Sequence, residues 1–271
     1  MAFQHAFGSI GAGHMAEAVV AAALRAGLWP ASGMLVSDPQ PERRTLFTGR
    51  FGIDATADNA RVVSDCACVM IAVKPQAFPS VAQELRELFT AAHLVVSIMA
   101  GVSAARVADL LGGRPRVVRV MPNLPIMVGA GMSGLWPGPA ATPEDVDLVR
   151  RLFDAGGETL VVSDESLIDA VTAVSGSGPA YFYAFVEAIA AGGAACGLTE
   201  AEALRLARAA CLGAARMMIQ TGEPPAELRR KVTSRGGTTQ AALEHLEACG
   251  ADRAIRDAVV AAFRRARELG G

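Results

Sequence analysis

The stretch that decides the fold of the amino-terminal half is Ala6-Phe7-Gly8-Ser9-Ile10-Gly11-Ala12-Gly13-His14-Met15-Ala16. It begins with a short apolar strand and leads into an Ala/Val/Leu-rich helix over residues 15–26. Gly11 permits the tight turn between them, Gly13 leaves room for a pyrophosphate at the helix N-terminus, and Ala16 lets helix and strand pack closely. Because this G-x-G-x-x-A motif opens a βαβ unit, it predicts a dinucleotide-binding site rather than an ordinary turn.

Further apolar runs follow this unit along the first half of the chain. They lie at residues 34–37, 66–73, 94–99 and 117–121, with helical stretches between them, for instance 79–89 and 103–111. Continuous apolar runs are typical of parallel strands that helices cover on both faces. The alternation predicts an α/β fold that begins with a Rossmann-type, doubly wound parallel sheet.

The second half of the chain changes character. A Thr-Pro-Glu-Asp sequence at residues 142–145 predicts a helix start, and residues 158–162 form the last expected strand. From Leu167 onward only helices are expected; Thr199-Glu200-Ala201-Glu202 is a capping box that opens a long helix ending at Gly222. A terminal helix is predicted over residues 252–269. We therefore predict two domains, a dinucleotide-binding domain at 1–163 and an all-helical domain at 164–271.

Composition and charge limit the class of protein. A chain of 271 residues with 52% hydrophobic residues can form two packed domains of ordinary size. The net charge is −2, with 13 Lys and Arg against 14 Asp and Glu up to residue 163, and 12 against 13 after it. Since neither half has the basic excess that a phosphate backbone requires, no nucleic-acid partner is expected.

The cysteines and the apolar runs bear on the compartment. The five cysteines show no metal-ligand spacing, and Cys66 and Cys68 fall in a predicted strand, so we expect buried thiols and no metal site. This usage indicates a reducing, cytoplasmic setting. The N-terminus does not resemble a signal peptide, and no run of about 18 apolar residues occurs, so no membrane partner is expected.

The residues after the second predicted strand bear on the choice of cofactor. Asp38 would favour the free ribose hydroxyl of NAD, whereas Ser37, Arg43 and Arg44 would suit the 2′-phosphate of NADP. The arginines could equally form the solvated face of a short helix. We expect Pro39 to turn Asp38 outward, which favours NADP without excluding NAD.

Ala72-Val73-Lys74-Pro75-Gln76 follows another predicted strand, at the edge of the sheet where ligands bind in such folds. Lys74 is one of only two lysines, against 23 arginines. A functional role is therefore predicted for Lys74; the alternative is a surface charge whose stem covers apolar neighbours.

Two motifs in the second half combine small residues with hydroxyl groups. Ser175-Gly176-Ser177-Gly178-Pro179 interrupts an apolar helical context, since Gly and Pro disfavour helix interiors. We predict a helix break there, with a new helix starting at Pro179 and capped by Ser177 or Gly178. A flat substrate could approach this break, or it could be a plain packing break.

The other motif is the loop Ser234-Arg235-Gly236-Gly237-Thr238-Thr239 at a predicted helix start. Its backbone N–H groups and hydroxyls would bind an anion such as a carboxylate. Simple N-capping of the next helix by Thr238 is the alternative, and both can hold together.

These motifs resemble those of the pyrroline-5-carboxylate reductase family. The resemblance rests on residues 169–181 (DAVTAVSGSGPAY) and 232–239 (VTSRGGTT), with the glycine turn, the AVKPQ run and Arg119-Val120-Met121-Pro122-Asn123. It extends over essentially the whole chain in the family's order. The sequence departs from the family pattern at His14, Leu124, Ala130 and Arg235, of which Arg235 loosens and charges the loop.

The resemblance implies an NAD(P)H-dependent reduction of the C=N bond of 1-pyrroline-5-carboxylate to L-proline, the last step of proline biosynthesis. It gives residues 164–271 a substrate-binding and dimerisation role, in a homodimer that can build a larger homo-oligomer such as a decamer. Since a protonated imine is already electrophilic, positioning could supply much of the rate, and Thr172 is the candidate donor to the ring nitrogen. The implied cofactor residues are Ile10, Gly11, Ala12, Gly13, His14, Met15, Ser37, Asn59, Ala72, Val73, Lys74, Pro75, Met99 and Ala100. The implied substrate residues are Glu165, Val232, Ser234, Gly237, Thr238 and Thr239.

Two alternative functions are weighed against this one. A β-hydroxyacid dehydrogenase-like oxidoreductase would share the N-terminal pattern, but that family uses a catalytic lysine in its second domain, and residues 167–223 contain no lysine. A non-catalytic dinucleotide-sensing module stays open, because this hydride transfer requires no catalytic His or Asp whose loss would show in the sequence.

Overall fold

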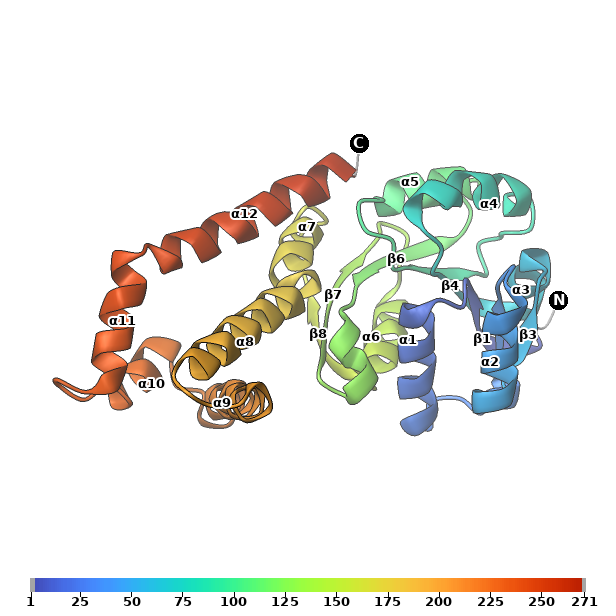
Figure 1. The fold of residues 1–271 in the computed structure, drawn as a ribbon. Coiled ribbons are helices and arrows are strands. Elements are labelled where there is room, and N and C mark those ends of the chain that lie inside the picture. The colour runs from blue at the N-terminus through green and yellow to red at the C-terminus, as the bar shows by residue number, and fades with distance from the viewer. Residues whose placement is uncertain (1–2, 270–271) are drawn as a thin grey trace. The chain divides into compact units, whose positions relative to one another are not determined.

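The computed structural model describes residues 3–269 of the 271 (Figure 1). The contacts within the chain divide it into two compact units. The sheet unit comprises Met1–Ser177 and Ala262–Gly271, and the helical unit comprises Gly178–Ala261. The segment 164–177, which we assigned to the second domain, falls with the sheet unit in this division.

An eight-stranded sheet, in the order β3-β2-β1-β4-β5-β6-β7-β8, forms the centre of the sheet unit. All neighbouring strands run parallel except β6 and β7, which are antiparallel. The predicted doubly wound fold is therefore confirmed. The strands are β1 (His5–Ile10), β2 (Met34–Ser37), β3 (Asp54–Thr56), β4 (Cys66–Ile71), β5 (Leu94–Ser97), β6 (Arg116–Met121), β7 (Gly131–Pro137) and β8 (Gly157–Val161).

Helices cover both faces of this sheet, with α1 and α6 on one face and α4 and α5 on the other (Figure 1). Each face has its own buried apolar cluster, as expected for a parallel sheet. The predicted start of α6 is confirmed, because Thr142 and Asp145 form a capping box and Pro143 is the first helical residue. The helices of this unit are α1 (His14–Arg25), α2 (Pro41–Leu46), α3 (Asn59–Asp65), α4 (Phe78–Leu85), α5 (Ala104–Leu110), α6 (Pro143–Asp154) and α7 (Leu167–Val171).

Short 3-10 and π-helical turns complete the sheet unit. The 3-10 turns are η1 (Ala31–Gly33), η3 (Pro75–Ala77) and η4 (Leu124–Val128), and the π-helical turns are η2 (Phe47–Phe51) and η5 (Thr172–Gly176).

The sequence did not predict strands β3 and β7. β3 has only three residues, and its apolar content is low. β7 contains glycines, which usually weaken strands, but here they permit close packing. A Cβ on Gly131 would lie 2.8 Å from the Ile126 Cα, and one on Gly134 would lie 2.5 Å from the Val171 Cγ1. The glycines of β7 are therefore a packing requirement that no local pattern reveals.

The predicted helix break within Ser175–Pro179 is confirmed, with the new helix beginning one residue earlier than expected. The Ser177 N–H donates to the Thr172 carbonyl at 2.8 Å, so α7 widens into the π-helical turn η5, which the sequence did not predict, before the break at Ser177. α8 then begins at Gly178, which places Pro179 in a first turn, where its missing N–H has no intrahelical partner to lose.

The helical unit contains no strand, as predicted. The capping box of Thr199 and Glu202 opens α9, and Gly222 ends it in the left-handed conformation at φ +64°. Between Gly178 and Ala261, the only buried apolar side chains are those of Ala203 and Ala207. The helices are α8 (Gly178–Ala195), α9 (Glu200–Thr221), α10 (Pro225–Lys231), α11 (Thr238–Ala248) and α12 (Ala251–Leu269), whose last residues belong to the sheet unit.

No helix within residues 3–269 is both long enough and apolar enough to cross a membrane.

Candidate cofactor and substrate site

The predicted cofactor residues meet at the carboxyl edge of the sheet. β1 and β4 are neighbours there, and the chain leaves them toward opposite sides, which is where open α/β sheets bind ligands. Asn59 opens α3 and reaches the same edge, because the Ser37 hydroxyl donates to its Oδ1 at 2.7 Å. The remaining residues follow β1 (Ile10–Met15), β2 (Ser37), β4 (Ala72–Pro75) and β5 (Met99 and Ala100).

The two positions of the turn, Gly11 and Gly13, accommodate glycine for different physical reasons. Gly11 has φ +98°, and a Cβ on it would lie 2.7 Å from the Ala72 carbonyl oxygen, so the fold itself requires glycine. Gly13 has φ −70°, and a Cβ on it would meet nothing within 4 Å. Since no side chain caps α1, the turn leaves the N–H groups of this helix open to an anion.

Asp38 points into the turn. Its Oδ2 accepts the Ala12 N–H at 2.9 Å, and its Oδ1 accepts the Gln40 N–H at 2.9 Å. Our expectation that Pro39 turns Asp38 outward is therefore wrong. The reason is that the turn frees a backbone donor at Ala12, which the carboxylate satisfies.

Arg43 also supports the turn. Its Nε donates to the Ala12 carbonyl at 2.6 Å, and its guanidinium pairs with Glu17 at 2.8 Å, with only 18% of the side chain exposed. The solvated-face interpretation is thus wrong for Arg43. Arg44 donates to the carbonyl oxygens of Asp38 and Pro39 at 2.7 and 2.9 Å. Arg43 therefore holds the β2–α2 connection against the glycine turn, whereas Arg44 fixes the backbone within that connection.

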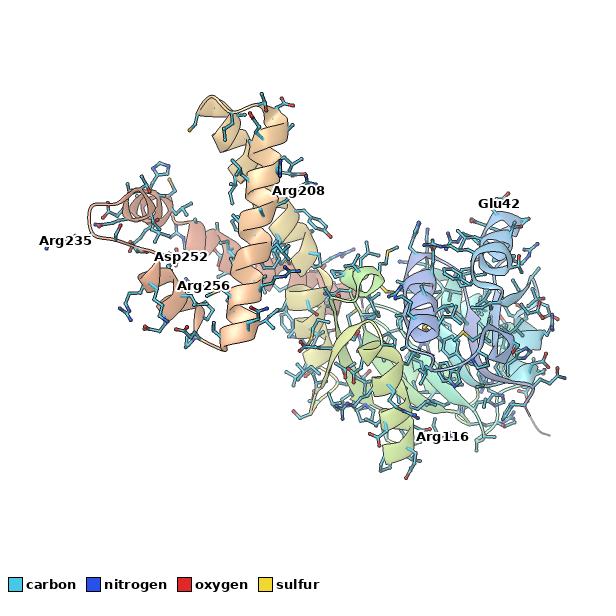
Figure 2. All side chains as sticks on the ribbon, turned by 90° about the horizontal axis from the view of Figure 1, so that it is seen from below. Glu42, Arg116, Arg208, Arg235, Asp252 and Arg256 are labelled. Atoms are coloured by element: carbon cyan, nitrogen blue, oxygen red, sulfur yellow. The ribbon has the colours of Figure 1, made fainter. Side chains whose placement is uncertain are left out.

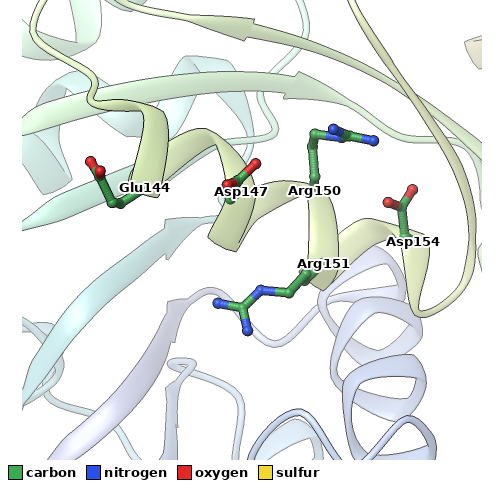
Figure 3. A pocket seen from close by; sticks show the side chains of 5 residues that line it. All are labelled: Glu144, Asp147, Arg150, Arg151 and Asp154. Atoms are coloured by element: carbon green, nitrogen blue, oxygen red, sulfur yellow. The ribbon is translucent and has the colours of Figure 1, made fainter.

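Lys74 lies exposed at the predicted place, after the carboxyl end of β4. A cavity of about 260 Å³ opens beside the next residues and is bounded by Pro75, Gln76, Gly101 and Arg106, among others. Another hollow, of about 460 Å³, is lined by Glu144, Asp147, Arg150, Arg151 and Asp154 of α6 (Figure 3). Since these five side chains come from the exposed face of one helix, we do not assign that hollow to the site.

Glu165 takes part in a half-buried ion cluster around the buried Arg119, which the sequence did not reveal. Its Oε1 accepts the Ala104 N–H at 2.6 Å and pairs with Arg119 at 3.2 Å. Arg119 is 4% exposed and also reaches Asp169 at 3.4 Å, while its Nε is buried without a partner within the described residues. The available signal was an arginine inside the apolar run 117–121, and we used it only as part of a motif.

Thr172 lies at the start of the π-helical turn. Its hydroxyl donates to the Ile168 carbonyl at 2.8 Å. In this arrangement its oxygen offers lone pairs rather than a proton, so the geometry favours an acceptor role over the donor role that we expected.

The predicted anion loop lies between α10 and α11 in the helical unit, and Arg235 is exposed on it (Figure 2). Gly237 is the N-cap of α11, without a side-chain cap, so the expected capping by Thr238 is wrong because Thr238 is already helical. The Gly236 N–H donates to Gln240 at 2.7 Å. The N–H groups of the first turn of α11 thus have no side-chain cap, next to the hydroxyls of Thr238 and Thr239.

Comparison with known proteins identifies the family. Residues 165–269 match a family model described as pyrroline-5-carboxylate reductase dimerisation, and residues 6–101 match one described as NADP oxidoreductase, coenzyme F420-dependent. A pyrroline-5-carboxylate reductase of Pseudomonas aeruginosa is 42% identical over 260 residues, which cover 96% of this chain and 95% of that protein. The chain belongs to the pyrroline-5-carboxylate reductase family.

Solved structures agree with this assignment. A pyrroline-5-carboxylate reductase from Coxiella burnetii superposes with a TM-score of 0.91 at 33% identity, over 99% of both chains. The Plasmodium falciparum pyrroline carboxylate reductase, described with NADP bound, superposes with a TM-score of 0.89 at 25% identity, over 100% of both chains. The chain is therefore an NAD(P)-dependent oxidoreductase that acts on a C=N bond, and its second half carries the dimerisation region of the family. The β-hydroxyacid dehydrogenase alternative is thereby rejected.

The departures from the pyrroline-5-carboxylate reductase pattern lie outside the core. All four side chains are exposed, namely His14, Leu124, Ala130 and Arg235. Because none of them packs in the interior, they do not alter how the family fold is built.

Proposed function

We propose that this protein reduces 1-pyrroline-5-carboxylate to L-proline with a hydride from NADPH bound at the carboxyl edge of the sheet. The observation that carries the cofactor part is the open N-terminus of α1 beside Gly13. A Cβ at this position would meet no atom of the protein within 4 Å, so packing does not require glycine here and the space beside it is open to a ligand. A pyrophosphate fits this position, because backbone N–H groups and the helix dipole both favour an anion.

We infer a preference for NADPH from the hydrogen bonds that Asp38 accepts. Both of its carboxylate oxygens already accept backbone N–H groups, so Asp38 is poorly placed to bind a ribose hydroxyl. Ser37 and Asn59, joined by a hydrogen bond, would lie on the phosphate side. The relative from Plasmodium falciparum is described with NADP bound, which supports the same choice. NADH is proposed as a poorer second cofactor.

For the substrate, we propose that the Ser234–Thr239 loop and Val232 hold the carboxylate while Glu165 and Thr172 lie near the ring. The hydride forms a new C–H bond at the carbon of the protonated C=N bond, and the π electron pair of that bond moves to nitrogen, which keeps its proton. The Thr172 oxygen would then accept the ring N–H instead of supplying a proton. Thr172 belongs to the sheet unit and the loop belongs to the helical unit.

We propose a homodimer formed through the helical unit, since that unit exposes large apolar side chains and matches the dimerisation model. Assembly into a larger homo-oligomer such as a decamer is part of the same proposal. The five cysteines are all free thiols, which supports a reducing, cytoplasmic location.

The test is an assay of NADPH oxidation by the purified chain with 1-pyrroline-5-carboxylate, with L-proline identified as the product. NADH in place of NADPH tests the cofactor preference, and a β-hydroxyacid with NADP⁺ is the negative control. If NADPH binds but is not oxidised, the alternative of a non-catalytic dinucleotide-sensing module replaces this proposal.

A further inference from the structure

The motif Arg119-Val120-Met121-Pro122-Asn123 has so far no chemical role. It occupies the end of β6, and both of its polar side chains are buried, Arg119 at 4% and Asn123 at 7% exposed. Buried polar groups are kept where they have specific partners. Each of the two side chains has at least one partner within residues 165–175, the segment that contains Thr172.

Asn123 connects β7 to the π-helical turn η5. Its Nδ2 donates to the Ser175 carbonyl at 3.0 Å, and its Oδ1 accepts the Met132 N–H at 2.9 Å. In an α-helix the Ser175 carbonyl would accept the N–H of residue 179, but residue 179 is a proline and has none. Asn123 thus supplies a donor where the backbone cannot.

The same segment is fixed to β6 and β7 at further points. A Cβ on Gly176 would lie 2.9 Å from the Met121 Cε, and one on Gly134 would lie 2.5 Å from the Val171 Cγ1. Arg119 pairs with carboxylates on either side of Leu167, at Glu165 and at Asp169. The end of β6 and the neighbouring strand β7 therefore hold the backbone on both sides of Thr172.

We infer that Asn123 is a positioning residue of the reductase, which sets the place of Thr172 by holding the π-helical turn through the Ser175 carbonyl. The inference rests on the proposed role of Thr172 at the substrate ring. π-Helical turns are frequent at functional sites, where one extra residue shifts the following side chains. We therefore expect loss of the Asn123 hydrogen bonds to change the geometry around Thr172 as well as the stability of the fold.

The test compares Asn123→Ala with the parent in the full chain. Steady-state kinetics should show kcat/KM for 1-pyrroline-5-carboxylate lowered by about tenfold or more, with the KM for NADPH within about twofold, because none of the proposed cofactor residues is changed. Hydrogen exchange followed by mass spectrometry should be faster in peptides that contain Thr172–Gly176. Asn123→Asp keeps an acceptor for the Met132 N–H but places a second acceptor opposite the Ser175 carbonyl. Its kcat/KM should therefore be lowered at least as much as that of Asn123→Ala.

Thr142→Ala is the matched control, because it removes another hydrogen bond between a side chain and the backbone, at the start of α6. It should lower the Tm while leaving kcat/KM and the exchange of Thr172–Gly176 unchanged. If Asn123→Ala lowers only the Tm, as Thr142→Ala does, the positioning role is refuted. If the parent itself does not reduce the imine acid, the proposed function fails; unchanged exchange in Asn123→Ala would then refute the inference separately.

Discussion

The two units of this protein bury their large apolar side chains to different extents. In the sheet unit, Phe7, Phe47 and Phe153 are completely buried. In the helical unit, Phe182 and Ile189 of α8 are 59% and 57% exposed, and Ile219 of α9 is 75% exposed. Exposed apolar surface on this scale marks an interaction site. The sheet unit forms its core from one chain, whereas the helical unit needs a partner surface, in agreement with its match to the dimerisation model.

This difference also separates the two halves of the proposed site. The cofactor residues follow successive strand ends of one sheet, so the order of the chain alone brings them together. The substrate residues are divided between η5 and the loop before α11, which belong to different units. Cofactor binding should therefore be a property of the sheet unit, and substrate turnover a property of the assembled protein.

The largest expected effect tests whether cofactor binding belongs to the sheet unit alone. Gly13→Val should weaken NADPH binding by about 100-fold or more, because a side chain would occupy the space for the pyrophosphate. The fold and the assembly should persist, since a Cβ there meets no protein atom within 4 Å. Fluorescence titration and sedimentation measure the two properties. Gly49→Val is a control in the same unit, also with nothing within 4 Å, and should bind NADPH normally. Normal binding by Gly13→Val would contradict the proposed cofactor site.

The next effect tests the need of the helical unit for a partner. Phe182→Asp combined with Ile189→Asp should convert the assembled protein to monomers or unfold the helical unit. Each large apolar side chain contributes about 1.5–3 kcal/mol when buried, and a symmetric interface buries it in both chains. Light scattering and circular dichroism give the readout. Leu88→Asp alters a side chain of the sheet unit that is 38% exposed and should leave the assembly intact. A parent protein that is a stable monomer at micromolar concentration would refute the claim that the helical unit needs a partner surface.

A smaller effect tests the substrate half of the site. Thr239→Ala removes one hydroxyl from the proposed carboxylate loop, which should raise the KM for 1-pyrroline-5-carboxylate by roughly 10- to 150-fold and leave that for NADPH unchanged. Gly237→Val should be more severe, because a Cβ there would lie 2.4 Å from the Ser234 Oγ. Unchanged KM values for both variants would mean that the loop merely begins α11.

The sequence predicted those features that depend on neighbours in the chain. Apolar runs located six of the eight strands to within a residue or two, and the Thr-Pro-Glu-Asp sequence at 142–145 and the capping box at Thr199 marked helix starts. The sequence did not predict features that depend on contacts between residues far apart in the chain. The orientation of Asp38 depends on an N–H 26 residues away, and the partners of Arg119 lie 46 and 50 residues along the chain. Such contacts follow from the folded sheet and leave no periodic trace in the sequence.

The distant contacts explain the errors at the site. Asn123 was recognised as part of a motif, yet its partner Ser175 lies 52 residues later, on a helical turn whose π geometry no propensity predicts. No strand was predicted around Gly134, where the close approach of Val171 from a later helix requires glycine. The sequence therefore showed which residues matter at the strand ends, whereas the structure was needed to show how they support one another.

The smallest expected effect concerns the ion pairs of the two units. Arg116 donates to both carboxylate oxygens of Asp145 at 2.7 and 3.1 Å, and Asp145 is 6% exposed. Burial raises the pKa of Asp145, but the hydrogen bonds from Arg116 and from the Thr142 backbone outweigh this and lower the pKa below its ordinary value. In the helical unit, by contrast, Arg256 and Asp252 pair at 3.3 Å with side chains that are 70% and 77% exposed.

Asp145→Asn should therefore destabilise the protein by about 1–2 kcal/mol at neutral pH, whereas Asp252→Asn should have an effect below about 0.5 kcal/mol. Because the pKa of Asp145 is depressed in the folded state, its contribution is present above the unfolded pKa of about 3.9 and is lost as the pH falls below it. The difference between the parent and Asp145→Asn should shrink accordingly between about pH 5 and pH 2. Urea unfolding at constant protein concentration measures it. A difference that stays constant with pH would show that Asp145 acts through packing and not through its charge.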